Sequence, residues 1–249
     1  MSELNVATLR TPTVQSLLGR AAVYELLSCA FSYPDAESVE QLQAYIRDIA
    51  EHPIADGLEL GPLLSALEHE LEGTPLRSLE TGHTGLFAGD VQCSPHETEY
   101  DFDTFVKARQ LADIAGFYRA FGLKPAGPKR EAPDFVATEL EFLSIVTLKQ
   151  AYANVQGWED EATVAADALR AFVQDHAGRW IPTLCRSIAE TQGASPFYLA
   201  AAALCARVFE REIQRLGVSP NYAAPRRLGR SERETFTCGL ATAAETEEE

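Results

Sequence analysis

The feature that most constrains the fold is a helical spacing of apolar residues that recurs along most of the chain. In one window after another, apolar side chains return three and four positions apart. This spacing places them on one face of an α-helix, and the alternating pattern typical of strands is missing. The sequence therefore predicts an all-α fold, a single globular bundle of about eight to ten helices.

Caps, prolines and glycines mark where these helices are expected to begin and end. We predict one helix from Thr11-Pro12 to a point before Pro34, and a second that Asp35 caps. Further helices are predicted over about 62–72, 105–121, 134–155 and 160–176, then a short one from Pro182 and a last one from Ser195-Pro196 to Gly217. Residues 74–104 show a less regular pattern and carry no predicted helix.

Three of these predictions are specific enough to check residue by residue. Asp134 is expected to cap the helix that follows it, whose segment 142–148 is apolar on nearly every side and therefore central. The helix over 160–176 is predicted to bury Val164, Ala168, Leu169, Phe172 and Val173. The last helix is predicted to pack through Leu199, Ala202, Ala206, Phe209, Ile213 and Leu216.

The 249 residues allow one large domain, with two irregular segments. Residues 1–218 are predicted to form the helical domain, and residues 219–249 a C-terminal tail that is mobile at its end. The tail carries Arg226, Arg227, Arg230 and Arg233 before it closes on ETEEE. Three prolines and a small basic island occupy 123–133, so this segment is the expected internal hinge loop.

Net charge and segment chemistry exclude several classes of protein. The formal net charge is −16, which argues against a nucleic-acid binder and fits either a basic peptide partner or a simple solubility charge. No apolar run is long enough for a membrane span, and the N-terminus lacks a secretory pattern. We therefore expect no stable membrane insertion, a cytoplasmic location, and five reduced cysteines without C-x-x-C spacing.

The densest group of reactive side chains lies in 93–103 and consists of Cys93, His96, Glu97, Glu99, Asp101 and Asp103. As a metal site it offers one closely spaced pair, Cys93 and His96, but no second pair follows to complete four ligands. It can equally be an acidic loop capping a helix that begins near Asp103. A third interpretation is a recognition surface, in which carboxylates meet guanidinium groups beside Tyr100, Phe102 and Phe105.

Motifs that would identify an enzyme are missing from the sequence. There is no G-x-S-x-G, H-E-x-x-H, G-x-G-x-x-G or Walker A pattern. Glu139 and Glu141 point to nearly opposite sides of a helix, so they cannot act as an acid/base pair. His176 is expected to be a hydrogen-bonded core residue. We predict no catalytic residue, no metal and no cofactor, which favours a binding protein.

Four segments together resemble the TorD/DmsD/NarJ family of redox-enzyme maturation chaperones. They are the segment 86–100 with LFAG and SPHETEY, the segment 111–122 (LADIAGFYRAFG), the segment 132–143 with APDF and ELEFL, and Asp175-His176 with the Trp180-Ile181-Pro182 run. The resemblance also includes the YELL pattern at 24–27 and covers all but the tail. The SPHETEY form is most similar to chaperones of the type II dimethyl sulfoxide reductase group.

The resemblance implies an all-helical chaperone without enzymatic activity. Its partner would be the catalytic subunit of a molybdenum-cofactor oxidoreductase, bound through its leader, often a twin-arginine leader, or through its body. Binding would delay export until the cofactor is inserted. The chaperone would be a monomer or a dimer swapped across the hinge. Two alternatives stay open, a small metalloenzyme using Cys93, His96 and nearby carboxylates, and a structural subunit of a redox complex.

Mapped onto this sequence, the client-binding residues are expected to lie in two segments. They are Glu97, Glu99, Tyr100, Phe102, Pro133, Asp134, Phe135, Thr138 and Glu141. The bland alternative for Asp134, Thr138 and Glu141 is a capped, solvated helix face. The family often carries Pro-Asp-His where this chain has Pro133-Asp134-Phe135, which removes an imidazole that the family uses near its leader site.

Overall fold

The computed structural model describes residues 9, 11–88, 93–101, 104–124 and 132–224, and within these ranges every regular element is a helix. The all-α prediction is confirmed. The elements are α2 (Pro12–Phe31), α3 (Ala36–Ala50), α4 (Ile54–Gly57), α5 (Gly61–Glu72), α6 (Leu76–Phe87), η1 (Glu97–Tyr100), α7 (Thr104–Ala120), α8 (Val136–Gln156), α9 (Glu159–Phe172), η2 (Val173–Ala177), α10 (Gly178–Glu190) and α11 (Pro196–Leu216). In this series η1 is a short 3-10 helix and η2 a single π-helical turn.

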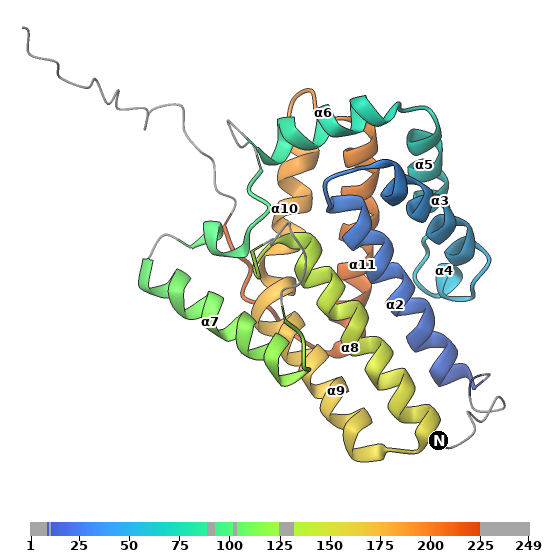
Figure 1. Cartoon of the computed structure of the whole chain (residues 1–249), viewed down its shortest axis with the longest axis vertical. Helices are drawn as coiled ribbons and strands as arrows, with labels where there is room; N and C mark the ends of the chain where they lie inside the picture. Colours follow the sequence, from blue (N-terminus) through green and yellow to red (C-terminus); the bar gives the residue numbers. More distant parts are fainter. Residues whose placement is uncertain (1–8, 10, 89–92, 102–103, 125–131, 225–249) are drawn as a thin grey trace, which may run out of the picture.

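Helices α2 and α8 form the centre of the bundle and pack along each other over most of their length (Figure 1). Helix α9 folds back on α8, and α11 packs between α10 and α5. The apolar side chains of these helices form one large core, with a small second cluster around Val14, Leu17 and Ala151. Helix α7 lies at the edge of the bundle, next to η1 (Figure 1).

Several helix ends follow the chemistry that the sequence predicts. The Thr11 hydroxyl accepts a bond from the Val14 amide, and Asp35 and Ser38 form a reciprocal capping box at the start of α3. Helix α11 ends at Gly217, whose φ of 60° lies in the left-handed region that other residues rarely adopt. These local signals fix the ends of the long helices before any packing is considered.

Two boundary predictions are wrong. The chain forms α6 in the segment where no helix is predicted. The prediction missed this helix because its buried positions, Leu79, His83, Leu86 and Phe87, include a histidine that breaks the apolar pattern. Pro182 lies inside α10 and does not start it. The π-helical turn carries the chain from α9 into α10 without a break, so no helix begins at the proline.

Two inward-facing predictions and one capping prediction also need correction. Val164 is 62% exposed, and its neighbour Ala165 is buried instead. The buried stripe of α11 includes Tyr198, Ala201, Cys205, Val208 and Glu212, so it is rotated by about one residue from the predicted stripe. Asp134 does not cap α8, because the N-cap is Phe135 and the Asp134 carboxylate bonds elsewhere.

The two irregular segments fall partly outside the described residues. Of the predicted hinge 123–133, residues 125–131 lie outside them, as does the tail from 225 onward. Residues 219–223 belong to the predicted tail but are hydrogen-bonded to η2 and α10. No helix among the described residues is long and apolar enough to cross a lipid bilayer.

Candidate functional site

The segment containing η1 lies against the start of α8, so the structure brings the two predicted site segments together. The Glu97 amide donates to the Asp134 carbonyl at 3.0 Å, and the Val136 amide donates to the Pro95 carbonyl at 2.9 Å. His96 and Phe135 form an isolated antiparallel bridge between the same two segments. We call this region, together with the side chains of η2 and α10 that pack on it, the polar junction.

Asp134 is a buried anchor of the polar junction. Its carboxylate accepts hydrogen bonds from the Thr98 hydroxyl at 2.7 Å and the Thr98 amide at 3.2 Å, and it lies 3.3 Å from His96 Nδ1. Burial pushes the pKa of Asp134 upward, but the hydrogen bonds from His96 and Thr98 outweigh burial and hold the pKa below its ordinary value. Asp134 therefore stays ionised and fixes the η1 segment.

His176 connects the interior of the junction to its surface. Its Nδ1 lies 3.1 Å from Glu97 Oε2, and its Nε2 lies 3.2 Å from Asp113 Oδ2, which is on α7. Burial opposes protonation, yet the two carboxylates outweigh it and raise the pKa of His176. The π-helical turn of η2 carries this histidine, and such turns are frequent at functional sites.

Glu97 and Glu139 form a buried carboxyl pair. Glu139 is 0% exposed, and its Oε2 accepts a hydrogen bond from Trp180 Nε1 at 2.9 Å. Burial, followed by the charge of Glu97, raises the pKa of Glu139 well above its ordinary value. The other carboxyl oxygen, Glu139 Oε1, is buried and has no hydrogen-bond partner. Protonation of Glu139 removes one negative charge from the interior and gives Glu139 a proton that it can donate to Glu97.

An acidic rim surrounds the outer edge of the junction. We define it by Glu99, Asp101 and Asp113, together with Gln110 of α7. Glu99 pairs with Lys107 at 3.1 Å, and Asp101 lies 3.8 Å from a guanidinium nitrogen of Arg179. Gln110 donates to Asp101 through Nε2, while its Oε1 is buried and has no hydrogen-bond partner. The rim therefore combines carboxylates with an unused buried acceptor.

The remaining predicted site residues differ in how deeply they are buried. Tyr100 is buried with its ring near Trp180, and Phe135 is buried with its ring 5.5 Å from that of His96. The Pro133 carbonyl accepts a bond from the Tyr118 hydroxyl at 2.6 Å. Thr138 is partly buried, and Phe102 lies outside the described residues.

Among the predicted carboxylates, exposure separates two roles. Glu97 and Asp134 are buried and already bonded within the junction, so they position neighbouring groups. Glu99 is half-exposed on the rim. Glu141 is exposed on α8, where its charge is one of the causes that raise the pKa of Glu25 on α2, after the larger effect of burial. The structure thus does not gather all four carboxylates on one open surface.

Sequence reasoning missed three residues of this site. Arg179 lies on α10, far along the chain from η1, whereas Gln110 and Asp113 lie on α7, the helix that directly follows η1. The packing of α7 and α10 against η1 makes these three residues part of the site, and no motif in the sequence indicated it. The buried position of His176 was predicted and is confirmed, although its partners are two carboxylates.

The proposed ligands of a metal site point in different directions. The Cys93 thiol lies 3.3 Å from the Thr191 hydroxyl, whereas His96 faces Asp134. Within the described part of the chain, no three His, Cys, Asp or Glu side chains converge as metal ligands. The geometry gives the metalloenzyme alternative no support.

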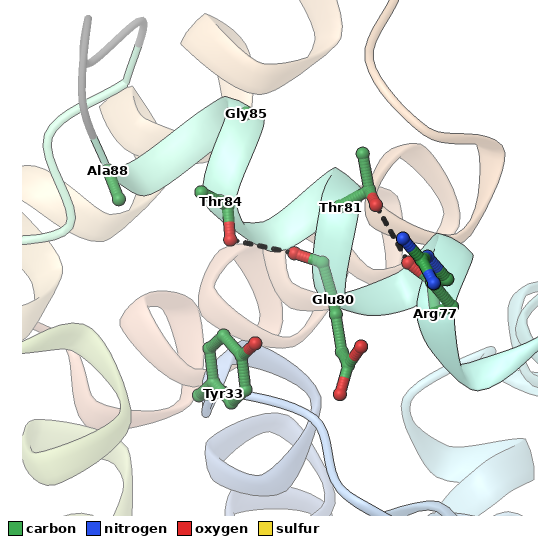
Figure 2. A pocket seen from close by; sticks show the side chains of 7 residues that line it. All are labelled: Tyr33, Arg77, Glu80, Thr81, Thr84, Gly85 and Ala88. Carbon is green, nitrogen blue, oxygen red and sulfur yellow. Dashed lines mark hydrogen bonds between the residues drawn. The ribbon is translucent and has the colours of Figure 1, made fainter.

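Two open clefts flank α6, away from the residues predicted as the site. The larger has a volume of about 730 Å³ and is lined by six residues of α6 and the turn that follows it, with Tyr33 opposite (Figure 2). In Figure 2 the Thr81 and Thr84 hydroxyls are bonded back to their own helix, which leaves Arg77, Glu80 and the Tyr33 ring as the distinctive surface. The second cleft, about 570 Å³, lies between α6 and the turn at 191–196.

Fold and site together define an all-helical binding protein, built around a partnered polar junction with an acidic rim. The family model described as nitrate reductase delta subunit matches residues 31–186. The chain belongs to this family, which confirms the resemblance to the NarJ-like maturation chaperones.

Curated relatives agree with this assignment. The perchlorate reductase assembly chaperone protein of Dechloromonas aromatica (strain RCB) is 27% identical over 224 residues, covering 82% of this chain and 92% of the relative. The selenate reductase assembly chaperone protein of Thauera selenatis is 30% identical, covering 72% and 81%. The chlorate reductase assembly chaperone protein of Ideonella dechloratans is 26% identical, covering 69% and 78%. The chain is accordingly a maturation chaperone and not an enzyme.

Proposed function

We propose that this chaperone acts in the cytoplasm on the catalytic subunit of one molybdenum-cofactor oxidoreductase, as a system-specific partner. It binds the subunit through its leader, its body or both, assists cofactor insertion and delays twin-arginine export. The observation that carries the proposal is the similarity over most of the chain to assembly chaperones for three reductases of oxyanions.

We place the leader-binding surface on the acidic rim and the polar junction beneath it. Arginine side chains form strong, bidentate bonds with carboxylates, and Asp101, Glu99 and Asp113 lie at the surface of the junction. The buried Tyr100, Asp134 and Phe135 support this surface from below, and the partly buried Pro133 and Thr138 flank it in sequence. Glu97 holds Arg179 and His176 in place. Glu141 and Phe102 remain candidate contacts on its borders.

The client can be identified by affinity capture from the native host, grown so that its respiratory reductases are synthesised. We expect mass spectrometry to find one molybdoenzyme catalytic subunit that still carries its leader. The mature, assembled enzyme as a permanent partner would instead favour a structural subunit. A capture without any molybdoenzyme subunit, while that enzyme is being made, would contradict the proposed function.

The site can be tested with a synthetic leader peptide of the captured client and fluorescence anisotropy. Because rim charges are exposed, the Asp101→Lys and Glu99→Lys variants should weaken binding about tenfold at low salt, and added salt should weaken binding to the unmodified chaperone. The matched control is Asp160→Lys, an exposed acid in the first turn of α9, away from the rim. Equal affinities for the rim variants and the control would exclude this site.

A further inference from the structure

Helices α2 and α8 share a face that is open to solvent between α3 and α9. The two helices lie side by side at the front of Figure 1. The Ser28 hydroxyl donates to the Ala137 carbonyl at 2.8 Å. Further along the pair, the Ser144 hydroxyl donates to the Ala21 carbonyl at 3.0 Å. Residue numbers therefore rise along α2 as they fall along α8, so the helices are antiparallel and side chains on the same flank form one surface.

Each of the two helices contributes a stripe of residues spaced four, three and four positions apart. We call the two stripes together the α2–α8 face, and they are Leu18, Ala22, Glu25 and Cys29 on α2, and Glu141, Ile145, Leu148 and Tyr152 on α8. This spacing keeps the side chains on one side of a helix. Leu148 is 44% exposed and Tyr152 is 51% exposed, although both are large and apolar. The α2–α8 face is therefore a mainly apolar surface that is only partly covered.

The α2–α8 face contains two carboxylates without a cation. Burial raises the pKa of Glu25, the nearby Ser144 hydroxyl lowers it, and the charge of Glu141 raises it further. Among the residues that the structure describes, neither Glu25 nor Glu141 forms an ion pair with Lys, Arg or His. An opposite charge favours the ionised form of a partly buried acid. The face is therefore complementary to a guanidinium or ammonium group.

The carboxylates lie within the apolar surface and not at its end. On one side of Glu25 lies the partly buried ring of Tyr45 on α3, whose pKa is raised by burial and then by the charge of Glu25. On the other side, the stripes continue through Ile145 to Leu148. A leader carries its basic residues at one end of an uncharged apolar segment. The face instead fits an amphipathic helix with a cation between apolar residues.

We propose that the α2–α8 face binds an amphipathic helix from the body of the client subunit, with a lysine or arginine of that helix opposite Glu25 and Glu141. The inference rests on the proposed function, because the helix belongs to the same client. From Glu141 to Tyr152 the face spans roughly 16 Å, the length of about three helical turns. A second copy of this chain fits less well, because it would add carboxylates to a surface that lacks cations. Leader and body bound at separate surfaces raise each other's effective concentration.

The α2–α8 face can be tested by calorimetric titration of the full chaperone with the captured client subunit, produced without its leader. Leu148→Ser and Glu25→Gln should each weaken binding about tenfold. Glu25→Gln alone should also reduce the salt dependence of the affinity, because it removes a charge. The affinity for the leader peptide should stay unchanged in both variants. The matched controls are Val164→Ser, at an apolar residue 62% exposed on α9, and Glu161→Gln, at an exposed acid of the same helix.

The outcomes separate this inference from the proposed function. If Leu148→Ser and Glu25→Gln bound the leaderless subunit as tightly as the controls do, the α2–α8 face would be excluded while the chaperone function stands. Binding of the leader peptide without binding of the leaderless subunit would likewise overturn only the docking of the body. A chaperone dimer that Leu148→Ser dissociates in analytical ultracentrifugation would assign the face to a second copy. Binding of neither leader nor subunit would refute the proposed function and the face together.

Discussion

The molecule buries carboxylates in two places, and it neutralises them in different ways. Glu212 of α11 is buried between Arg20 and Arg215, and it accepts a hydrogen bond from the Tyr24 hydroxyl at 3.1 Å. Burial and the neighbouring Arg215 lower the pKa of Arg20 to about 10, so both arginines remain charged at neutral pH. This cluster ties α2 to α11 through ion pairs between Glu212 and two charged arginines.

The polar junction uses groups that do titrate. Burial, followed by the charge of Glu97, raises the pKa of Glu139, and the imidazole of His176, whose pKa is also raised, lies between Glu97 and the solvent-exposed carboxylate of Asp113. Buried charges are retained only when they are paired, and here the pairing depends on where protons reside. The comparison teaches that Glu212 serves as a fixed brace, whereas the polar junction is a pH-sensitive support beneath the client surface.

Removing the fixed brace should have the largest effect on stability. In the Glu212→Gln variant, Arg20 and Arg215 lose their shared anion, and we expect the free energy of unfolding to fall by about 4 kcal/mol. The exposed Glu210→Gln on the same helix is the control and should change stability by less than about 0.5 kcal/mol. Denaturant unfolding of both variants measures the difference, and similar losses would show that Glu212 is no special brace.

Replacing a buried glutamate of the polar junction by glutamine should lower the free energy of unfolding by less, because a second buried carboxyl can take over its negative charge. In Glu97→Gln, Glu139 can release its proton and face the junction as an anion, so we expect a loss of about 2 kcal/mol. Glu99→Gln, two residues away and half-exposed, is the matched control. A double-mutant cycle with Glu139→Gln should show a coupling of about 1 kcal/mol. Strictly additive losses would argue against a direct interaction between Glu97 and Glu139.

Sequence reasoning predicted the long helices well, for physical reasons visible in particular residues. The cap at Thr11-Pro12, the Asp35 cap and the stop at Gly217 depend on neighbours in sequence, and all three are found. Helix α6 was missed because His83 occupies one of its inward positions, where its ring packs near those of Tyr33, Phe87 and Tyr198. An apolar periodicity does not register such a histidine.

The buried acids could not be predicted in the same way. Glu212 belongs to the inward stripe of α11, and Glu139 to the interior of α8, but an isolated glutamate indicates a solvated face. Their burial depends on partners from distant segments, namely Arg20 for the former and Trp180 with Glu97 for the latter. The two segments of the polar junction could be named from the sequence, whereas their division into buried supports and exposed rim could not.

The pH dependence of stability should distinguish the two clusters. The pKa values of His176 and Glu139 are raised in the folded state, so their stabilisation is complete below their unfolded values and is lost as pH rises through the folded values. Between pH 6 and pH 8 (a window set by the ordinary histidine pKa of about 6.5), the unfolding temperature should therefore fall.

Two variants test whether His176 and Glu139 cause this fall of the unfolding temperature with pH. Because glutamine does not titrate, His176→Gln and Glu139→Gln should each flatten the decline of unfolding temperature with pH, measured by circular dichroism. The matched control His69→Gln removes an exposed imidazole on α5 and should leave the decline unchanged. Glu212→Gln should lower the unfolding temperature at every pH without altering the slope. A slope that responds to Glu212 rather than to the junction would reverse the comparison.

The smallest expected effect comes from restoring an imidazole at residue 135. Phe135 is buried against the ring of His96, and His96 already supplies Asp134 with an imidazole partner from the η1 segment. Phe135→His should therefore cost about 1 kcal/mol through lost apolar burial, with little gain from a second partner for Asp134. The loss should be smaller at pH 6 than at pH 8, because the protonated ring would face a carboxylate.

Phe135→Leu is the matched variant, since it changes the apolar shape without adding a titratable group. Denaturant unfolding at both pH values compares the two. If Phe135→His were stabilising while Phe135→Leu was not, His96 would be an incomplete partner for Asp134. If both variants lost the same free energy at both pH values, the ring of Phe135 would serve packing alone, and the titrating behaviour of the junction would lie entirely with Glu139 and His176.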